Sequence, residues 1–415
     1  MCQLPLLASG LAGDTIINSG FTDQLSHKAQ LDAGRDFGKG ARSLGRAALV
    51  GALLQLRSHT RDFVLSLPHS AFVPAIHHGI NPPLWECAHI GWFAEWWCVR
   101  GAYNTTDGAT VSDKPSLWAA ADAMLNSNTL AHDDRWSLAL LTRESTVEYL
   151  DKTLYAVLSS LKLQSDSDDA LYPYRLSLFH EAMHLEALAW CAQTLGGVRP
   201  AWVRSLPPMH RPGEVLVPSG EYHCGHKGTG FSFDNERDGC AKEISEFSID
   251  HTPISNAQFA QFVESGEYQA RLGSSHPCFW RQANGEWQMR YFDQWQTLDP
   301  RAPVIHVSAL EAEAYCHWAG RRLPTESEWE AAAQLGAIDW GNSVWEWTAT
   351  TFAPYPGFSA DRYREYSAPW FDGKHRVLRG GSHATLALMH HSAYRNYFLP
   401  ERSEVFAGFR TCPSP

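Results

Sequence analysis

Apolar residues recur at three- and four-residue steps through the first half of the chain, from Ser43 to about Leu195. This spacing gathers apolar side chains on one face of a helix with 3.6 residues per turn. The predicted helices are ARSLGRAALVGALLQLRSHTRDFVLSL, LWECAHIGWFAEWWCVR, RESTVEYLDKTLYAVLSSLKL and ALYPYRLSLFHEAMHLEALAWCAQTL. Gly196 and Gly197 mark the end of the last one. Four long helices joined by loops favour an antiparallel bundle.

The pattern changes after the Pro-rich segment RPAWVRSLPPMHRPGE, where helical periodicity gives way to short apolar runs. The predicted strands are GEVLVPSGEYHCG, EISEFSIDHTPIS, HRVLRGGSH and FAGFRTC, and the predicted short helices are NAQFAQFVESG and SALEAEAYCHWAG. We therefore expect an α+β chain with a helical domain over residues 44–205 and an irregular α+β domain over residues 206–415. Residues 1–43 are polar and weakly periodic, which predicts a disordered arm.

Length, charge and cysteine content narrow the class of protein. A chain of 415 residues suits two domains. Its formal net charge of −11 argues against a nucleic-acid partner, which needs clustered Lys and Arg. No stretch approaches the ~20 apolar residues of a membrane span. The nine cysteines form no C-x-x-C pair and fit free thiols in a reducing compartment, so the sequence predicts a cytoplasmic protein.

The segment FHEAMHLEA places His180 and His184 four residues apart, and therefore on one face of the last predicted helix. Both imidazoles can reach one metal ion, although two half-exposed helix histidines would give the same spacing. His89, in the aromatic segment LWECAHIGWFAEWW, is a candidate third ligand because a buried imidazole without a partner is costly. A hydrogen-bonded core histidine is the alternative. Three neutral nitrogen ligands suit Zn, Fe or Cu, so the spacing does not name the metal.

These motifs in combination resemble a known family. LFHEAMHLEAL and LWECAHIGWFAEWW resemble the DinB-like iron domain of the ergothioneine synthases, a group of sulfoxide synthases. LPTESEWEAAA, WGNSVWEWTAT, RVLRGGSHA and FAGFRTC resemble the formylglycine-generating-enzyme-like (C-type-lectin-like) domain fused to it. The resemblance covers nearly everything after residue 45. It implies Fe(II) held by His89, His180 and His184, with O2 as oxidant and hercynine (N-trimethylhistidine) as substrate, whose imidazole C2 receives sulfur.

The resemblance also suggests residues around the iron. DRYREYSAPWFDG resembles a Tyr-x-x-Tyr segment of the mycobacterial enzymes, which implies Tyr363 as proton donor and Tyr366 in the hercynine pocket. A phenol suits the donor role because its pKa of about 10 keeps it protonated at neutral pH. The RNYF segment implies that Asn396 and Tyr397 contact hercynine.

We also expect aromatic side chains to face the trimethylammonium group of hercynine. Cation–π attraction of this kind is worth roughly 0.5–2 kcal/mol. The candidates are Trp92, Phe93 and Tyr397.

Several positions depart from the ergothioneine synthases. Met183 stands where those enzymes have Gln, and Phe398 stands where an Asp helps to hold γ-glutamylcysteine. Of two arginines that bind this donor, only Arg135 is kept, and His132 stands at the other position. Losing an acid and a base together removes the groups that clamp a zwitterionic dipeptide. We therefore expect a donor without amino-acid charges.

NPPLWECAHIGWFAEWW and the H-E-x-M-H-x-E-A motif resemble the selenoneine-synthase branch of the same group. This resemblance implies a selenosugar, 1-selenoglucose, as second substrate, and a selenoxide that is later reduced to selenoneine. Three alternatives stay open: a sulfoxide synthase using cysteine or γ-glutamylcysteine, a zinc-dependent thiol transferase, and a binding module without enzymatic activity. Formylglycine chemistry is not expected, because no paired cysteines accompany the C-terminal motifs and Cys412 is isolated.

Overall fold

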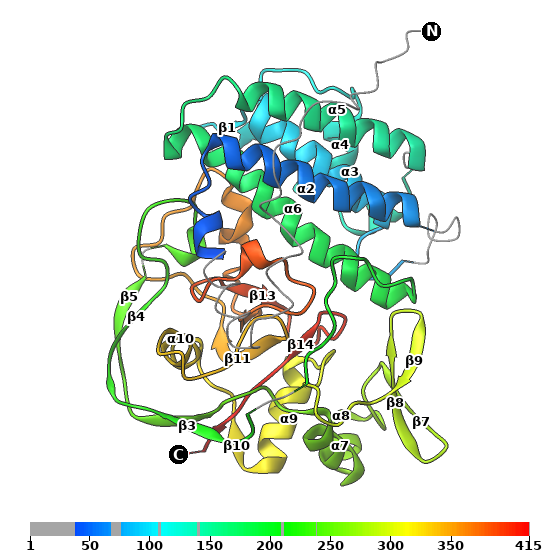
Figure 1. Cartoon of the computed structure of the whole chain (residues 1–415), viewed down its shortest axis with the longest axis vertical. Coiled ribbons are helices and arrows are strands. Elements are labelled where there is room, and N and C mark those ends of the chain that lie inside the picture. Colours follow the sequence, from blue (N-terminus) through cyan, green and yellow to red (C-terminus); the bar gives the residue numbers. More distant parts are fainter. Residues whose placement is uncertain are drawn as a thin grey trace.

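The computed structural model describes residues 38–67, 76–106, 109–138, 142–208, 211–237 and 239–414. Its long helices gather at one end of the molecule, and most of its strands and short helices gather at the other (Figure 1). Most of the predicted arm, residues 1–37, lies outside the described residues. Residues 38–43 differ from the expectation of disorder: residues 38–41 are helical, and buried Arg42 forms an ion pair with Glu236, whose Oε2 atom lies 2.5 Å from Arg42 Nη1.

The helical end contains four long helices that follow the predicted segments. They are α2 (Arg46–Ser66), α3 (Pro83–Ala94), α5 (Arg143–Leu161) and α6 (Asp168–Leu195). Both α2 and α3 pack against α5 and α6, and every residue of α3 is buried. The Thr142 hydroxyl begins α5 by accepting a hydrogen bond from the Ser145 backbone N–H at 3.2 Å. Gly196 ends α6 with a φ of 70°, a left-handed conformation that glycine adopts without steric cost.

Shorter elements connect these helices. They are a π-helix that continues α3 (Glu95–Val99), β1 (Tyr103–Asn104), β2 (Thr110–Val111), α4 (Ala121–Leu125) and a 3₁₀ helix (Asp133–Trp136). No helix in the described ranges is long and apolar enough to cross a membrane.

A four-stranded sheet lies at the centre of the other end. Its order is β13 (Asn396–Phe398), β12 (Arg376–Arg379), β11 (Trp345–Thr351) and β14 (Ala407–Gly408). β14 runs parallel to β11, and the other neighbours are antiparallel. β12 lies in the predicted segment HRVLRGGSH, and β14 lies in FAGFRTC. The first four residues of β11 are buried, which makes this strand the centre of the second core.

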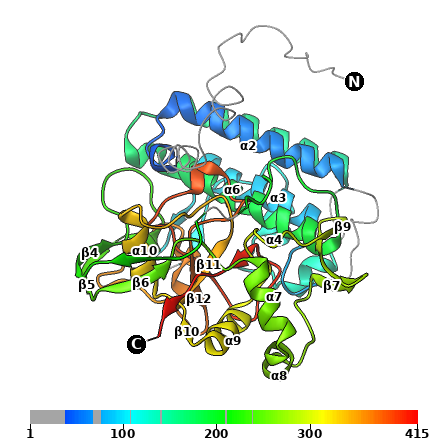
Figure 2. The ribbon, with the colours of Figure 1, turned by 60° about the horizontal axis from the view of Figure 1, so that its bottom comes forward.

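Smaller sheets and helices surround this sheet (Figure 2). The paired strands are β3 (Glu214–Val217) with β6 (Phe247–Asp250), β4 (Gly220–Cys224) with β5 (Cys240–Ile244), and β10 (Arg321–Arg322) with β15 (Cys412–Pro413). A three-stranded sheet contains β7 (Trp280–Ala283), β8 (Glu286–Tyr291) and β9 (Gln294–Thr297). The helices are α7 (Asn256–Glu264), α8 (Glu267–Leu272), α9 (Ala309–Ala319) and α10 (Glu326–Gln334). The β7–β8–β9 sheet has no counterpart among the predicted strands, because β9 is exposed throughout and carries no alternating pattern.

One buried carboxylate of α6 makes several of the contacts between the two ends. Glu186 is buried and accepts hydrogen bonds from Trp345 Nε1 at 2.8 Å, Ser382 Oγ at 2.5 Å and Thr385 Oγ1 at 2.8 Å. Because α6 also carries two of the candidate ligands, this contact fixes their helix against the strand-rich end.

Candidate metal centre and adjoining cavity

Three histidines from two helices converge between the long helices. His180 and His184 lie one turn apart on α6, and His89 faces them from α3. Ligand atoms of all three lie within 4.8 Å of one another, and the Nε2 atoms of His180 and His184 are 3.0 Å apart. His89 and His180 are buried, and His184 is partly exposed. This arrangement can hold one metal ion.

Hydrogen bonds orient two of the rings. His89 Nδ1 lies 2.7 Å from the Leu125 carbonyl oxygen, and His184 Nδ1 lies 2.5 Å from Glu86 Oε1. Both partners accept, so each Nδ1 carries the proton and each Nε2 is left with a lone pair. Such partners are typical of histidines that bind metal ions. The close Nε2 atoms of His180 and His184 repel each other unless a cation or a proton lies between them.

Burial keeps two of the three imidazoles, those of His89 and His180, uncharged. It lowers the pKa of His89 to about 3 and the pKa of His180 well below its ordinary value, and His184 acts in the same direction on both. Neutral imidazoles are the form that binds metal ions. The donor set therefore fits a first-row transition metal, including iron and zinc.

Glu86 supports the cluster, although the sequence analysis did not single it out. Its buried carboxylate accepts from His184 Nδ1 and also from Asn81 Nδ2 at 2.5 Å. Burial alone raises the pKa of Glu86, but the nearby His184 and the hydrogen bonds bring the net value below the ordinary one. The sequence held a signal for this role of Glu86: it is an acid three residues before His89, in a helix that otherwise carries almost no charge.

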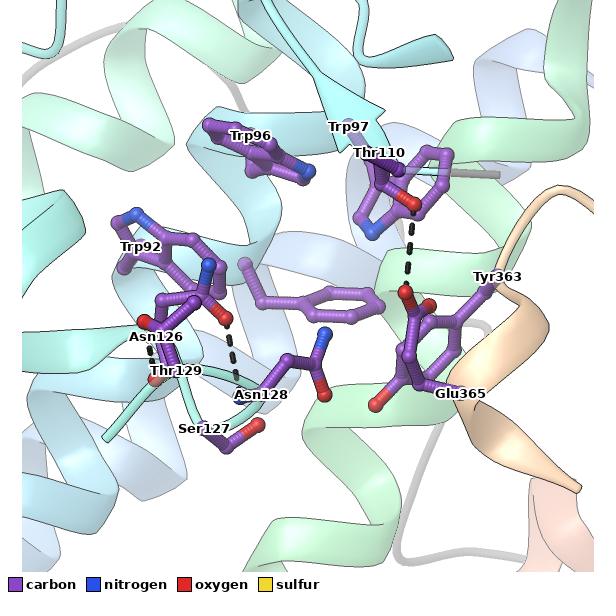
Figure 3. A pocket seen from close by; sticks show the side chains of 12 residues that line it. Trp92, Trp96, Trp97, Thr110, Asn126, Ser127, Asn128, Thr129, Tyr363 and Glu365 are labelled. Atoms are coloured by element: carbon purple, nitrogen blue, oxygen red, sulfur yellow. Dashed lines mark hydrogen bonds between the residues drawn. The ribbon is translucent and has the colours of Figure 1, made fainter. Parts of the chain in front are cut away.

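A cavity of about 210 Å³ adjoins the cluster (Figure 3). Its lining comprises Trp92, Phe93, Trp96, Trp97, Ala109, Thr110, Asn126, Ser127, Asn128, Thr129, Tyr363 and Glu365. Phe93 stacks on the His180 ring with centroids 3.5 Å apart, and Tyr363 lies edge-on to Phe93 at 5.1 Å. The cavity is therefore separated from the histidines by little more than one ring.

Aromatic rings form one wall of the cavity. The π-helix after α3 carries Trp96 and Trp97, and Trp92 stacks against Trp96 with centroids 5.3 Å apart. Asp122 holds this wall by accepting from Trp92 Nε1 at 2.9 Å and from two nitrogens of Arg100 at 2.6 and 2.9 Å. The Arg100 guanidinium also covers the Trp96 ring at 4.5 Å. The rings are thus fixed before any ligand binds.

Polar groups face the aromatic wall. Residues 126–129 contribute amide and hydroxyl groups, and Glu365 projects its carboxylate from the opposite side (Figure 3). Glu365 Oε1 accepts from Thr110 Oγ1 at 3.4 Å, while its Oε2 atom is buried and has no hydrogen-bond partner among the described residues. A carboxylate oxygen left in this way beside aromatic rings favours a cationic ligand.

The structure brings only some of the predicted substrate residues to the cavity. Trp92, Phe93 and Tyr363 line it. Tyr366 does not line the cavity. Its hydroxyl donates to Met183 Sδ at 3.6 Å. Burial raises the pKa of Tyr363 and of Tyr366 above the ordinary phenol value.

The remaining predicted residues have protein partners. Tyr397 donates its hydroxyl to the Tyr366 carbonyl, and Asn396 Oδ1 accepts from the Tyr397 backbone N–H at 3.0 Å. Phe398 packs edge-on against Trp190 with centroids 5.4 Å apart. None of these three side chains is part of the cavity lining.

Arg135 is also engaged within the protein. Its Nη1 atom donates to Asn81 Oδ1 at 2.8 Å, and its guanidinium covers the Trp85 ring at 4.3 Å. Trp85 in turn stacks on His89 with centroids 5.0 Å apart. Arg135 therefore reaches the histidine cluster through another side chain, Trp85.

The chain was compared with known proteins. Residues 203–342 and 333–414 match the sulfatase-modifying factor enzyme 1-like domain. The hercynine oxygenase of Mycolicibacterium thermoresistibile is 30% identical over 436 aligned positions, covering 88% of this chain and 94% of that protein. The hercynine oxygenase of Mycolicibacterium smegmatis is 30% identical, covering 80% and 90%. Ergothioneine biosynthesis protein 1 of Schizosaccharomyces pombe is 27% identical over 43% of this chain and 27% of its own length.

The histidine cluster, the cavity and these relatives define an enzyme of the oxidoreductase class. The chain belongs to the hercynine oxygenase family, and its second half is a sulfatase-modifying-factor-like α+β domain. The predicted resemblance of that half is confirmed. The DinB-like character of the helical end and the selenoneine-synthase branch stay predictions.

Proposed function

We propose that the protein is an Fe(II)- and O2-dependent enzyme that forms a carbon–chalcogen bond at C2 of hercynine. His89, His180 and His184 are the proposed iron ligands, supported by their convergent nitrogen atoms and by the burial that keeps His89 and His180 neutral. When bound, iron would supply redox chemistry and open coordination positions for O2. The proposed working units are a DinB-like helical domain, residues 44–205, and the α+β domain, residues 206–415.

The observation that carries this proposal is the cavity beside the histidines. Hercynine has a trimethylammonium group, a carboxylate and an imidazole. The rings of Trp92, Trp96 and Trp97 and the unpaired Oε2 atom of Glu365 suit the trimethylammonium group. The amide and hydroxyl groups of residues 126–129 suit the carboxylate. A ligand anchored there can direct its imidazole towards the cluster.

Tyr363 is the proposed proton donor. It lies between the cavity and His180, with ring centroids 6.5 Å apart, and burial raises the pKa of its phenol. The hydroxyl therefore stays protonated and can donate at neutral pH. Tyr366 has a supporting role in this proposal, because its hydroxyl donates to Sδ of Met183, which lies on α6 between His180 and His184.

The proposed second substrate is a selenosugar, 1-selenoglucose. The side chains at the positions of the γ-glutamylcysteine clamp present no free pair of opposite charges. Arg135 is bound to Asn81, and Phe398 packs on Trp190. His132 Nε2 lies 2.9 Å from the Ile80 carbonyl oxygen. A neutral sugar needs hydrogen bonds and an aromatic surface and does not need paired ions.

The proposed reaction balances with O2 as the only oxidant. A carbon–selenium bond forms as the C2 hydrogen of hercynine and the hydrogen of the selenol are removed. One oxygen atom leaves with these two hydrogens as water, and the other stays on selenium as the selenoxide.

The direct test is turnover by the Fe(II)-loaded protein with hercynine, O2 and one donor at a time, with products identified by mass spectrometry. We expect the selenoxide from 1-selenoglucose and little product from cysteine or γ-glutamylcysteine. Product from a thiol donor alone would overturn the selenosugar assignment and leave the hercynine assignment intact. No hercynine-derived product with any donor would overturn both.

The cavity assignment has its own test. Trp96→Ala and Glu365→Gln should each raise the KM for hercynine by about 2- to 30-fold, the equivalent of roughly 0.5–2 kcal/mol. Glu221→Gln, at the exposed position of β4, is the matched control. An unchanged KM in both cavity variants would place the trimethylammonium group elsewhere.

A further inference from the structure

A second group of metal-ligating side chains lies at the surface, apart from the three-histidine cluster. His78, His132 and Asp133 bring ligand atoms within 4.8 Å of one another. Asp133 Oδ1 lies 3.1 Å from His132 Nδ1 and 3.5 Å from His78 Nδ1. Nitrogen and oxygen ligands about 2.0–2.2 Å from a tetrahedral Zn²⁺ are roughly 3.3–3.5 Å from each other. The two carboxylate–imidazole pairs therefore already have nearly the spacing of a zinc site, and the ligand atoms of the two imidazoles lie within 4.8 Å of each other.

The orientation of His132 supports metal binding. Its Nε2 atom lies 2.9 Å from the Ile80 carbonyl oxygen, which can only accept, so Nε2 carries the proton. In the neutral ring, the lone pair of Nδ1 then faces the Asp133 carboxylate. A cation between these two groups removes the repulsion, and a backbone carbonyl on the far nitrogen is a usual partner of metal-bound histidine.

The surroundings leave the group open to an ion from solvent. The side chain of His78 is 83% exposed and that of Asp133 is 62% exposed. The neighbouring cation, Arg135, turns to Asn81 Oδ1 and to the backbone carbonyls of Ser127 and Leu130. It therefore does not neutralise Asp133.

We propose that His78, His132 and Asp133 form a second metal site, which binds a zinc-type transition-metal dication with solvent completing its coordination. The ion joins the segment before α3 to the 3₁₀ helix Asp133–Trp136. Asn81, in the first segment, hydrogen bonds both Arg135 and Glu86. The bound ion therefore restrains a segment that leads to the histidine cluster, while its own ligands lie outside that cluster.

Zinc counting tests this site independently of the enzymatic proposal. The full chain carrying His180→Ala and His184→Ala lacks the candidate iron centre. We expect it to bind one equivalent of Zn²⁺ by calorimetry, and to lose that equivalent when Asp133→Asn is added. Asp134→Asn, a change of the same kind at the adjacent exposed acid, should keep it.

A second measurement uses a spectroscopic signal and a variant at a different ligand of the site. Co²⁺ added to the His180→Ala/His184→Ala protein should give visible absorption bands of a nitrogen- and oxygen-bound ion, and His132→Ala should abolish them. No zinc equivalent in the parent of this series, or an equivalent that survives both Asp133→Asn and His132→Ala, would overturn the proposal.

Discussion

The two ends of the molecule stabilise buried carboxylates in different ways. Around the three-histidine cluster, they accept hydrogen bonds from histidine, amide, indole, hydroxyl and backbone groups. These carboxylates are Glu86, Glu95 and Glu186. In the strand-rich core, glutamates pair with buried arginines. These pairs are Arg42–Glu236, Arg379–Glu330, Arg395–Glu326 and Arg410–Glu346.

The difference has a physical reason. A buried arginine beside the histidines would repel a metal dication, whereas a carboxylate shared with histidine attracts one. Ion pairs in the second core need no such restraint, and they join separate elements, as Arg379 of β12 does with Glu330 of α10. Arg57–Glu181, between α2 and α6, is an ion pair of the second kind inside the helical end. The following predictions test this contrast, from the largest expected effect to the smallest.

Removing a candidate ligand should have the largest effect. His180→Ala leaves two imidazoles, so we expect loss of bound iron and a fall in turnover beyond the roughly 100-fold that outer contacts cost. Metal analysis and product formation measure both. His317→Ala, an exposed histidine at the end of α9, is the control. Full iron content in the His180 variant would mean that His180 is not a metal ligand.

Breaking an arginine pair should mainly reduce stability. Arg410→Met leaves Glu346 buried and uncompensated, which typically costs about 3–5 kcal/mol in the free energy of unfolding. Adding Glu346→Leu should recover much of that loss, because an apolar pair carries no desolvation cost. Urea denaturation of the single and double variants measures this. A single variant within about 1 kcal/mol of the parent would contradict the contrast.

Glu86→Ala should weaken metal binding with a smaller effect on folding. Loss of the partner of His184 Nδ1 is expected to reduce metal affinity by about 10- to 100-fold. Glu86→Gln should fall between, because its amide oxygen still accepts from the ring but carries no charge. Competition with a chromophoric chelator gives the affinities, with Glu365→Gln as control. Equal affinity in all four proteins would mean that Glu86 is a packing residue only.

The smallest effect near neutrality should be a pH dependence in the second core. Burial lowers the pKa of His306 to about 3 and of His383 to about 4. The unfolded chain therefore takes up protons near pH 6.5, while the folded core stays neutral. Stability falls as the pH falls, by less than about 1.4 kcal/mol per histidine for the step from pH 7 to 6. Urea unfolding midpoints of His306→Phe and of the parent, each at pH 7 and pH 6, measure how much His306 contributes to the loss of stability.

Regular periodicity made the helical end predictable. The start of α5 at Thr142 and the end of α6 at Gly196 depend on cap geometry, which local residues determine. The convergence of His180 and His184 also follows from helix spacing, and the approach of His89 was expected from a bundle. Gly380 has a φ of 102°, and an added Cβ there would lie 3.2 Å from Trp329, so both backbone and space favour glycine.

Features that depend on distant contacts escaped prediction. The π-helix places its first residue, Glu95, against the Leu117 backbone N–H and the Tyr149 hydroxyl, both far along the chain. The cavity wall formed by residues 126–129 has no periodic pattern, and Glu365 looks like any loop acid. Their proximity arises only when the strand-rich end lies against the helices.

Glu186 has a consequence for how this chain can be divided. A gene split between α6 and β3 would release a helical fragment in which the buried acid Glu186 has lost its indole and hydroxyl donors. The complementary fragment would expose the Trp345 indole and two hydroxyls that α6 normally covers. Each piece would therefore expose polar groups that are buried and hydrogen-bonded in the whole chain, so we expect the two halves to be less stable apart than together.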